Sequence, residues 1–406
     1  MQMKLRWKHL RHPVRSVASA KCRLQAGWAN RRLLYQGGRR FKPDPRYDLD
    51  AVTRGFRPLT GDTGCDRQLL QRICRAYCLA MSGEPIAPEK YNPTPWWQQQ
   101  RTAMLRPVIQ ALCSHDIDTL ESMYANFYRD DCSTGLLPVQ RVKGHYFGNS
   151  IRDVHRRLYL VDALYRLDYW KEQTDGRYSL RELAGPETGN PWGVVLEDTL
   201  VRAGAEYQHY CAQRIARLLP AGRATIAEIG GGFGGMAYYL LRDRPETTYI
   251  DFDVPESIAL ASYYLLKSFP GLNVVLYGEA ELNTETISTA DIILMPVFEL
   301  ERLEDQAVDL SFSSHALSDV RPEFAPEYLS DIARITRNHF LYVGSERFAK
   351  SIADVSTEPH GQFALLESRP SGWSDHIAPG AGHVEQLYGA AGREAAMSIS
   401  LSATAP

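Results

Sequence analysis

One stretch, Ala227 to Met236, constrains the fold of this chain more than any other. Its sequence, AEIGGGFGGM, follows an apolar segment at 224–227 and leads into a second apolar segment at 236–241. Glycine at 230, 232 and 234 permits a backbone with positive φ and lets a ligand approach where a Cβ would collide. The pattern predicts a strand, a tight turn and a helix, with a nucleotide-like ligand lying across the turn.

Two classes of cofactor fit the spacing of these glycines. Gly230, Gly232 and Gly235 match G-x-G-x-x-G, in which a dinucleotide pyrophosphate lies at a helix N-terminus. Glu228 instead begins E-x-G-x-G-x-G, the pattern of methyltransferases that bind S-adenosylmethionine. A carboxylate at the turn would repel a pyrophosphate but would suit a sulfonium and an amino group. We therefore predict that S-adenosylmethionine binds at Glu228, Gly230, Gly231, Gly232, Phe233 and Gly234, with an NAD-dependent oxidoreductase or epimerase as the alternative.

A second acid follows the next predicted strand. Residues 247–252 are β-branched and aromatic and run into Asp253, which lies 23 residues after Gly230. An acid at about this distance ends the second strand of nucleotide-binding sheets and takes the ribose hydroxyls. Asp251 lies on the same face of the strand and is a rival. We favour Asp253, because Pro255 can begin the following helix and so leaves Asp253 at the strand tip.

Methyl transfer to a hydroxyl needs a group that removes the hydroxyl proton, and His315 is the predicted base. It follows the predicted strand 308–313, whose carboxyl end opens toward the cofactor cleft in sheets of this kind. Asp319 lies four residues later, where one helical turn would let it orient the ring. Weaker candidates are His145 and the pair His383 and Glu385.

Other side chains could complete a site. Tyr207 and Arg214 precede the glycine strand and could reach a methionine carboxylate, while Trp192 and Trp373 could stack on a substrate ring. The seven cysteines show no C-x-x-C spacing and the acids form no compact ligand cluster, so no metal site is predicted. Free cysteines are typical of a reducing compartment, and the expected location is the cytoplasm.

Strands and helices alternate after residue 220, which is typical of a parallel, doubly wound α/β sheet. We predict strands near 224–229, 247–252, 273–277, 291–295, 308–313, 338–344 and 363–366. Either 273–277 or 291–295 is surplus in a methyltransferase sheet and must be an edge or an insertion. The expected organisation is a basic arm and linker at 1–62, a mainly helical region at 63–220, and the cofactor-binding domain with a C-terminal tail at 221–406.

The net charge of −2 conceals an asymmetric distribution. Residues 1–42 contain twelve Lys or Arg and no acid, and the remaining 34 basic and 48 acidic residues give the rest of the chain a charge of −14. Trp7, Leu10, Val14 and Val17 are near helical spacing, which is typical of a helix on an anionic membrane surface. The alternative is a solvated arm, or one docked on the acidic body. No module for nucleic acid is recognisable, so no nucleic-acid partner is expected.

Several segments together resemble a bacterial family of sugar O-methyltransferases, which have the Rossmann-like class I methyltransferase fold. The resemblance is carried by 227–235, YIDFDVPE at 249–256 and DLSFSSHALSD at 309–319, with AYYL at 237–240, YYL at 263–265 and FP at 269–270. It extends from about residue 140 to 345 and departs from the family at Ser313, where Asn is usual, and Asp319, where Glu is usual.

The resemblance implies a sugar or glycan acceptor, in surface polysaccharide or nucleotide-sugar biosynthesis. A non-catalytic role is the second alternative, in which the basic arm at 1–42 tethers an assembly partner of glycosyltransferases to the inner face of the membrane.

Overall fold

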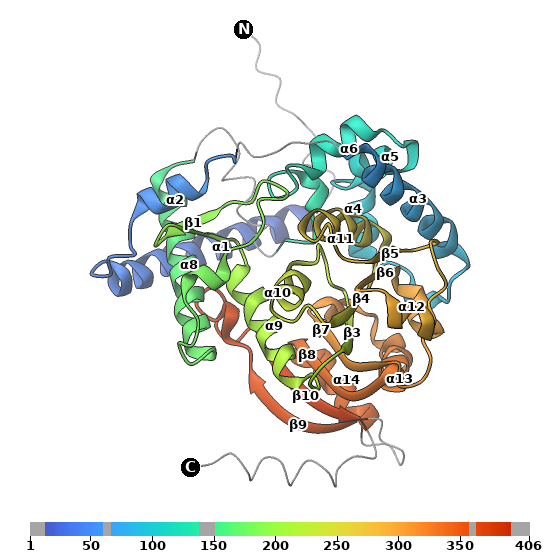
Figure 1. The fold of residues 1–406 in the computed structure, drawn as a ribbon. Helices are drawn as coiled ribbons and strands as arrows, with labels where there is room; N and C mark the ends of the chain where they lie inside the picture. Colours follow the sequence, from blue (N-terminus) through green and yellow to red (C-terminus); the bar gives the residue numbers. More distant parts are fainter. Residues whose placement is uncertain (1–12, 60–65, 138–150, 357–362, 391–406) are drawn as a thin grey trace.

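A twisted eight-stranded sheet forms the centre of the molecule. The computed structural model describes residues 13–59, 66–137, 151–356 and 363–390. The strand order is β5-β6-β4-β3-β7-β8-β10-β9 (Figure 1). The strands are β3 (Ala224–Ile229), β4 (Thr247–Asp253), β5 (Val274–Leu276), β6 (Ile292–Pro296), β7 (Val308–Ser314), β8 (Thr336–Ser345), β9 (Phe363–Pro370) and β10 (His383–Ala390).

The order of these strands assigns the fold. Strands β5, β6, β4, β3, β7 and β8 are parallel. The chain order reverses at β3, which pairs with β4 on one side and with β7 on the other. Strand β10 is inserted antiparallel between β8 and β9. The parallel core with a switch point and one reversed strand is the Rossmann-like class I methyltransferase sheet predicted from the sequence, and ligands bind at such a switch point.

The structure identifies the surplus strand. β6 lies inside the sheet between β5 and β4, and all of its residues are buried. β5 is a short edge strand. The inner strand is therefore 292–296, and the chain that follows it, η6 (Val297–Arg302), begins at the edge where β3 and β4 also end.

Strand β10 was not predicted. From the sequence, GHVEQLY offers only the weaker candidates His383 and Glu385, and the last strand is expected at 363–366. In the structure Glu385 is buried, and it accepts hydrogen bonds from Tyr210 (2.7 Å) and Arg369 (2.7 Å). An inward-facing carboxylate breaks the apolar alternation by which strands are recognised, and this concealed β10.

Helices cover the sheet on both faces, as alternate residues of each strand require. On β3, Ile226 belongs to one hydrophobic core and Ala227 to the other. The first core contacts α9 and α10, and the second contacts α13 and α14. The surrounding helices are α9 (Ala205–Leu218), α10 (Gly235–Asp243), α11 (Pro255–Ser268), α12 (Thr284–Thr289), α13 (Ala325–Ile335) and α14 (Glu346–Ser356).

The N-terminal region is mainly helical and shares the first of these cores. Leu70, Ile73 and Leu120 pack in the same buried cluster as Ile226. Its helices are α1 (Pro13–Phe41), α2 (Leu49–Gly55), α3 (Arg67–Gly83), α4 (Pro95–Thr102), α5 (Arg106–Ser114), α6 (Ile117–Tyr124) and α8 (Asp153–Gln173), followed by the hairpin β1 (Gly193–Leu196) and β2 (Thr199–Arg202). Helix α2 lies inside the segment for which the sequence suggested a linker, and it packs against β1.

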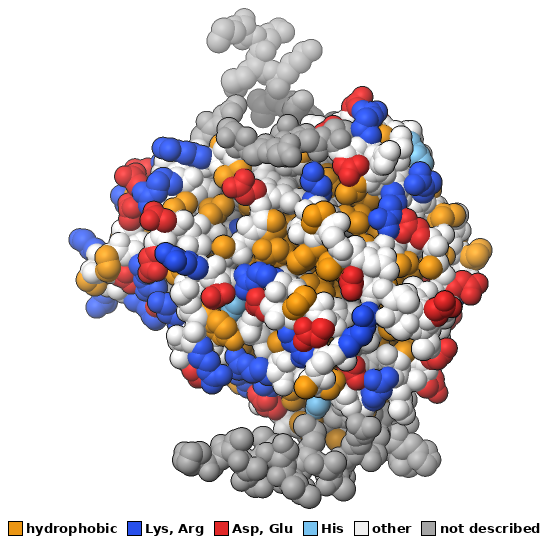
Figure 2. Space-filling model, in the orientation of Figure 1, with side chains coloured by type: hydrophobic (Ala, Val, Ile, Leu, Met, Phe, Trp, Pro, Cys, Tyr) orange, Lys and Arg blue, Asp and Glu red, His pale blue; other side chains and the backbone are white. Residues whose placement is uncertain are grey.

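Charged side chains of both signs are distributed over the face drawn in Figure 2, and hydrophobic side chains gather near its middle. Among the described helices, none combines the length and the apolar character needed to cross a bilayer.

Candidate active site

The glycine turn between β3 and α10 requires the glycines that the sequence placed there. Gly230, Gly232 and Gly234 have φ values of +86°, +65° and +85°, a region that residues with a Cβ rarely adopt. A Cβ on Gly231 would lie 2.6 Å from the Tyr249 hydroxyl and 2.7 Å from the Asp251 carboxylate. The turn is therefore fixed by its own conformation and by the side chains of the neighbouring strand.

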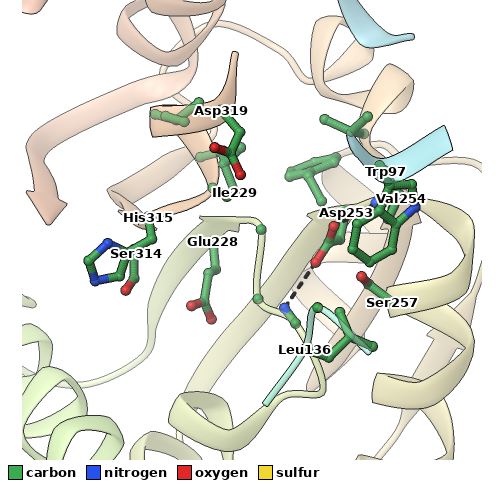
Figure 3. Close-up of a pocket in the computed structure, with 18 of the residues that line it drawn as sticks. Trp97, Leu136, Glu228, Ile229, Asp253, Val254, Ser257, Ser314, His315 and Asp319 are labelled. Atoms are coloured by element: carbon green, nitrogen blue, oxygen red, sulfur yellow. Dashed lines mark hydrogen bonds between the residues drawn. The ribbon is translucent and has the colours of Figure 1, made fainter. Parts of the chain in front are cut away.

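Three acids meet at the ends of β3 and β4. Glu228 accepts a hydrogen bond from Tyr249 (2.6 Å), and Asp251 accepts one from the backbone N–H of Gly231 (3.0 Å). Asp253 accepts from the N–H of Gly232 (2.9 Å), drawn as the dashed line in Figure 3, and from that of Val254 (2.7 Å). The two aspartates differ in their depth below the cavity. Asp251 is fully buried and holds the turn, whereas Asp253 lines the cavity.

Burial changes the titration of these acids. It raises the pKa of Glu228 to about 8, against the opposing hydrogen bond from Tyr249. It also raises the pKa of Asp253 to about 6, although the two backbone N–H groups favour the ionised form. Burial and the neighbouring carboxylates raise the pKa of Asp251 well above its usual range. Among the described residues no cation pairs with any of the three, so a positively charged ligand would stabilise their ionised forms.

A cavity of about 420 Å³ opens over the turn. The carboxylates of Glu228 and Asp253 lie on its floor, and Val254 and Val297 lie beside them. Figure 3 shows Glu228 and Asp253 reaching this space from neighbouring strand ends. Of the described residues that line the cavity, none is a lysine or an arginine. A dinucleotide pyrophosphate would therefore meet carboxylates without a cation, which disfavours the oxidoreductase alternative.

Two of the residues predicted at the cofactor lie elsewhere. Phe233 is 1% exposed and packs against Phe127 and Tyr264, with the guanidinium of Arg202 5.6 Å from its ring. Gly234 caps the start of α10, and neither residue lines the cavity. Glu228, Gly230, Gly231, Gly232 and Asp253 do line it. Phe233, which lies between Gly232 and Gly234 in the motif, is a core residue here, because its ring packs on Phe127 and Tyr128 of the N-terminal region.

His315 stands where β7 ends, as predicted. Its backbone has φ +65°, and its N–H donates to the carbonyl of Val343 (2.7 Å), which fixes the residue at the cavity edge. The ring lies 5.1 Å from the ring of His383 and 6.1 Å from that of Tyr207. Part of the ring reaches solvent, yet the surrounding protein atoms, aided by His383, lower the pKa of His315 to about 4. The imidazole is therefore neutral at physiological pH.

Asp319 does not orient this ring. It ends a short 3-10 turn, η7 (Ala316–Asp319), rather than an α-helical turn, so the expected contact four residues apart is not made. Figure 3 shows the His315 ring turned away from the Asp319 carboxylate, and no hydrogen bond joins the two. Both side chains line the cavity, and partial burial raises the pKa of Asp319. The two groups are thus independent.

Helix α9 contributes Tyr207, Gln208 and Cys211 to the cavity lining, and the sequence pointed only to Tyr207. Tyr207 lines the cavity, and its hydroxyl lies 2.6 Å from that of Ser314. Gln208, also in the lining, was missed. Its Oε1 accepts a hydrogen bond from Arg202 (2.6 Å), which leaves the amide N–H₂ as the group available to a ligand. Arg214 instead pairs with Glu367 and with Glu385 (3.3 Å), away from the cavity.

The roof of the cavity comes from the N-terminal region and was not predicted. Trp96 and Trp97 of α4 line it, with ring centroids 5.6 Å apart. Trp97 is anchored by a hydrogen bond from its indole N–H to Glu256 (3.2 Å), whereas Trp96 is 46% exposed. The roof also includes Leu136 and Leu137. Adjacent tryptophans at a helix start were an available signal, because one helix face cannot bury both.

The tryptophans proposed for stacking are core residues. Trp192 is 2% exposed and donates to the carbonyl of Tyr128 (3.0 Å), and Trp373 is 6% exposed and packs on Tyr207. His145 lies outside the described residues. Within the described ranges, no group of three or more His, Cys, Asp or Glu side chains could hold a metal ion.

Comparisons with known proteins add little to the fold. No family model and no curated protein matches the chain. Solved structures similar to it include a SAM-dependent methyltransferase from Aquifex aeolicus (12% identity, 44% of this chain and 88% of that one, TM-score 0.30). Another is magnesium protoporphyrin IX methyltransferase from Synechocystis with bound SAM (11% identity, 56% and 97%, TM-score 0.32), and a third is the [4+2]-cyclase SpnF (11%, 47% and 83%, 0.34). The fold assignment rests on the strand order of the sheet itself.

Proposed function

We propose that this chain is an S-adenosylmethionine-dependent O-methyltransferase that methylates a sugar hydroxyl. The assignment of the cofactor rests on the chemistry of the cavity floor. Buried carboxylates surround a glycine turn, and no lysine or arginine of the described lining neutralises them. A sulfonium and an ammonium group offset this negative charge, whereas a pyrophosphate adds to it.

The floor offers a partner for each polar part of the cofactor. Asp253 uses one lone pair of each oxygen on a backbone N–H and keeps others for ribose hydroxyls. Glu228 faces the cationic groups. The amide N–H₂ of Gln208, held by Arg202, is a donor for the methionine carboxylate. Val254 and Val297 give the adenine an apolar surface.

S-adenosylmethionine supplies an activated methyl group on a sulfonium leaving group. The chain must then hold the acceptor oxygen in line and take its proton. His315 is proposed as the base, since its neutral imidazole has a free lone pair at the cavity edge. Asp319 faces the same cavity independently of the ring and is placed to accept a hydrogen bond from a second acceptor hydroxyl.

The sugar rests on the family resemblance and on the character of the roof. Trp96 offers an exposed ring, and Asn92 and Thr94 line the cavity close to it in sequence. A sugar has an apolar C–H face that suits an aromatic ring and hydroxyls that suit amide and hydroxyl groups. Surface polysaccharide or nucleotide-sugar biosynthesis is the proposed setting.

The test is transfer of radiolabelled methyl from S-adenosylmethionine to a panel of sugars and nucleotide sugars. Wild-type protein is compared with Asp253→Asn, which keeps the shape but weakens ribose binding by about 10- to 100-fold, as loss of a charged hydrogen bond does. Asp305→Asn, an exposed acid far from the cavity, is the matched control. Transfer to a non-sugar acceptor alone would remove the sugar from the proposal, and no transfer with no cofactor binding would remove the whole.

A further inference from the structure

Helix α1 has one face that packs on the protein and an opposite face that does not. Leu33 and Phe41 are 3% and 1% exposed, and a Cβ on Gly37 would overlap Val161 of α8. These three positions are four residues apart and form one helical stripe. The last turns of α1 are therefore docked on α8, and the two helices lie side by side in Figure 1.

The opposite face carries two large aromatic side chains in solvent. Trp28 is 70% exposed and Tyr35 is 67% exposed. They are seven residues apart, two helical turns, so they lie above one another on the side away from Leu33 and Gly37. Exposed tryptophan is costly unless something covers it, and here two amphipathic rings are aligned on one stripe.

Arginines fill the same face between and beyond the rings. Arg31, Arg32 and Arg39 are exposed, and the Arg39 guanidinium lies 5.9 Å from the Tyr35 ring centroid. Within the described parts of the chain, none of the three forms an ion pair. Arg40, on the flank, differs because it pairs with Asp168 (2.6 Å). We call Trp28, Arg31, Arg32, Tyr35 and Arg39 the arginine-aromatic face.

We propose that the arginine-aromatic face binds the surface of an anionic lipid bilayer. Tryptophan and tyrosine place an apolar ring among lipid headgroups and keep a polar end in water. Exposed arginines are attracted to anionic headgroups, each by an amount that corresponds to about a fivefold change in partitioning. A helix with this composition lies in the plane of the interface and does not span the bilayer.

Two further observations favour a membrane over a nucleic acid. The face is the convex side of a single helix, whereas single-stranded nucleic acids are held in a basic groove with stacking platforms. The charge of the chain is also polarised: residues 1–42 hold twelve basic residues and no acid, and the remainder carries −14. An anionic surface would attract α1 and repel the body, which orients the protein with this helix toward the lipid. The proposal does not depend on the methyltransferase assignment.

The experiment is co-sedimentation of the full chain with vesicles of phosphatidylcholine alone and of phosphatidylcholine with about a third phosphatidylserine. The wild type is expected to bind only the anionic vesicles and to be released by high salt. R31E/R32E/R39E is expected to lower partitioning by at least about tenfold, and W28A/Y35A by less. The control R106E/R181E/R217E makes the same change in charge at exposed arginines elsewhere and should bind like wild type.

Each variant is expected to fold, because all five side chains are exposed. Far-ultraviolet circular dichroism and thermal unfolding check this. Equal binding to neutral vesicles, or equal loss in the two arginine triples, would overturn the proposal. So would failure of the wild type to bind anionic vesicles. Retained lipid binding by R31E/R32E/R39E, with loss of duplex DNA binding or of self-association measured in parallel, would assign the face to that other partner instead.

Discussion

The floor and the roof of the cavity were built in different ways. The floor is formed by Glu228 to Gly232 and by residues of the segment Phe252 to Ser257, which are joined by α10 and β4. The roof comes from α4 and from residues 135–137, about a hundred residues earlier in the chain. The floor depends on backbone conformation, which the local sequence determines through glycines and through acids at strand ends. The roof depends on how distant helices pack, which no local pattern specifies.

The largest effect is expected from a substitution in the glycine turn of the cavity floor. In Gly230→Ala the new Cβ would overlap Ala316, and the residue would keep a φ near +86°. Backbone strain and overpacking together should lower the free energy of unfolding by about 2–5 kcal/mol. Cofactor binding should be lost with it, because Gly230 belongs to the turn that lines the cavity floor. Chemical denaturation measures the first effect and calorimetry the second.

Gly271→Ala is the matched control, since a Cβ there meets nothing within 4 Å. It should leave both stability and binding within experimental error of wild type. Comparable destabilisation by the two variants would show that the turn at 230 is not specially constrained.

The second prediction separates the roles of His315 and Asp319, which the sequence pattern treats as a pair. His315→Ala should lower kcat by about 10²- to 10⁴-fold, as removal of a general base does, with cofactor binding retained. Asp319→Asn should have a much smaller effect, because no hydrogen bond joins it to His315. Steady-state kinetics at fixed cofactor concentration gives both numbers. Equal losses in the two variants would mean that the pair forms during turnover.

The same comparison explains what the sequence could predict. The parallel sheet, the positions of its strands β3 to β8 and the glycine turn were predicted correctly, because glycines and apolar strand segments have local signatures. Asp253 lines the cavity, and its contact with ribose stays a prediction. The pairing of His315 with Asp319 was wrong, since residues 316–319 form a 3-10 turn that the sequence did not distinguish from an α-helical one. Gln208 was missed because its role depends on Arg202, whose position is set by tertiary packing.

The third effect tests the roof. Trp96→Ala should raise the KM of the acceptor by about 3- to 10-fold, consistent with the loss of one aromatic contact, and leave the KM of the cofactor unchanged. Trp96 is 46% exposed, so the fold should tolerate the change. Trp28→Ala, an exposed tryptophan far from the cavity lining, is the control. A rise in the cofactor KM alone would place Trp96 in the cofactor half.

The last prediction concerns how the stability of the protein without ligand depends on pH. The folded-state pKa of Glu228 is raised to about 8, so the folded protein holds a proton that the unfolded chain releases near its ordinary pKa of 4.5. Stability without ligand should therefore fall as pH rises from about 5 to 8. Glu228→Gln should flatten this slope, measured as thermal unfolding across pH. A slope unchanged by the substitution would contradict the assignment to Glu228.

The central claim is that the carboxylates of the floor, with no lysine or arginine among the described lining residues, select a cationic cofactor over a dinucleotide. Isothermal titration of the wild-type protein with S-adenosylmethionine, S-adenosylhomocysteine and NADH, at one pH and salt concentration, tests it directly. The account predicts binding of both adenosyl compounds and none of NADH. Binding of NADH with no affinity for either adenosyl compound would contradict it.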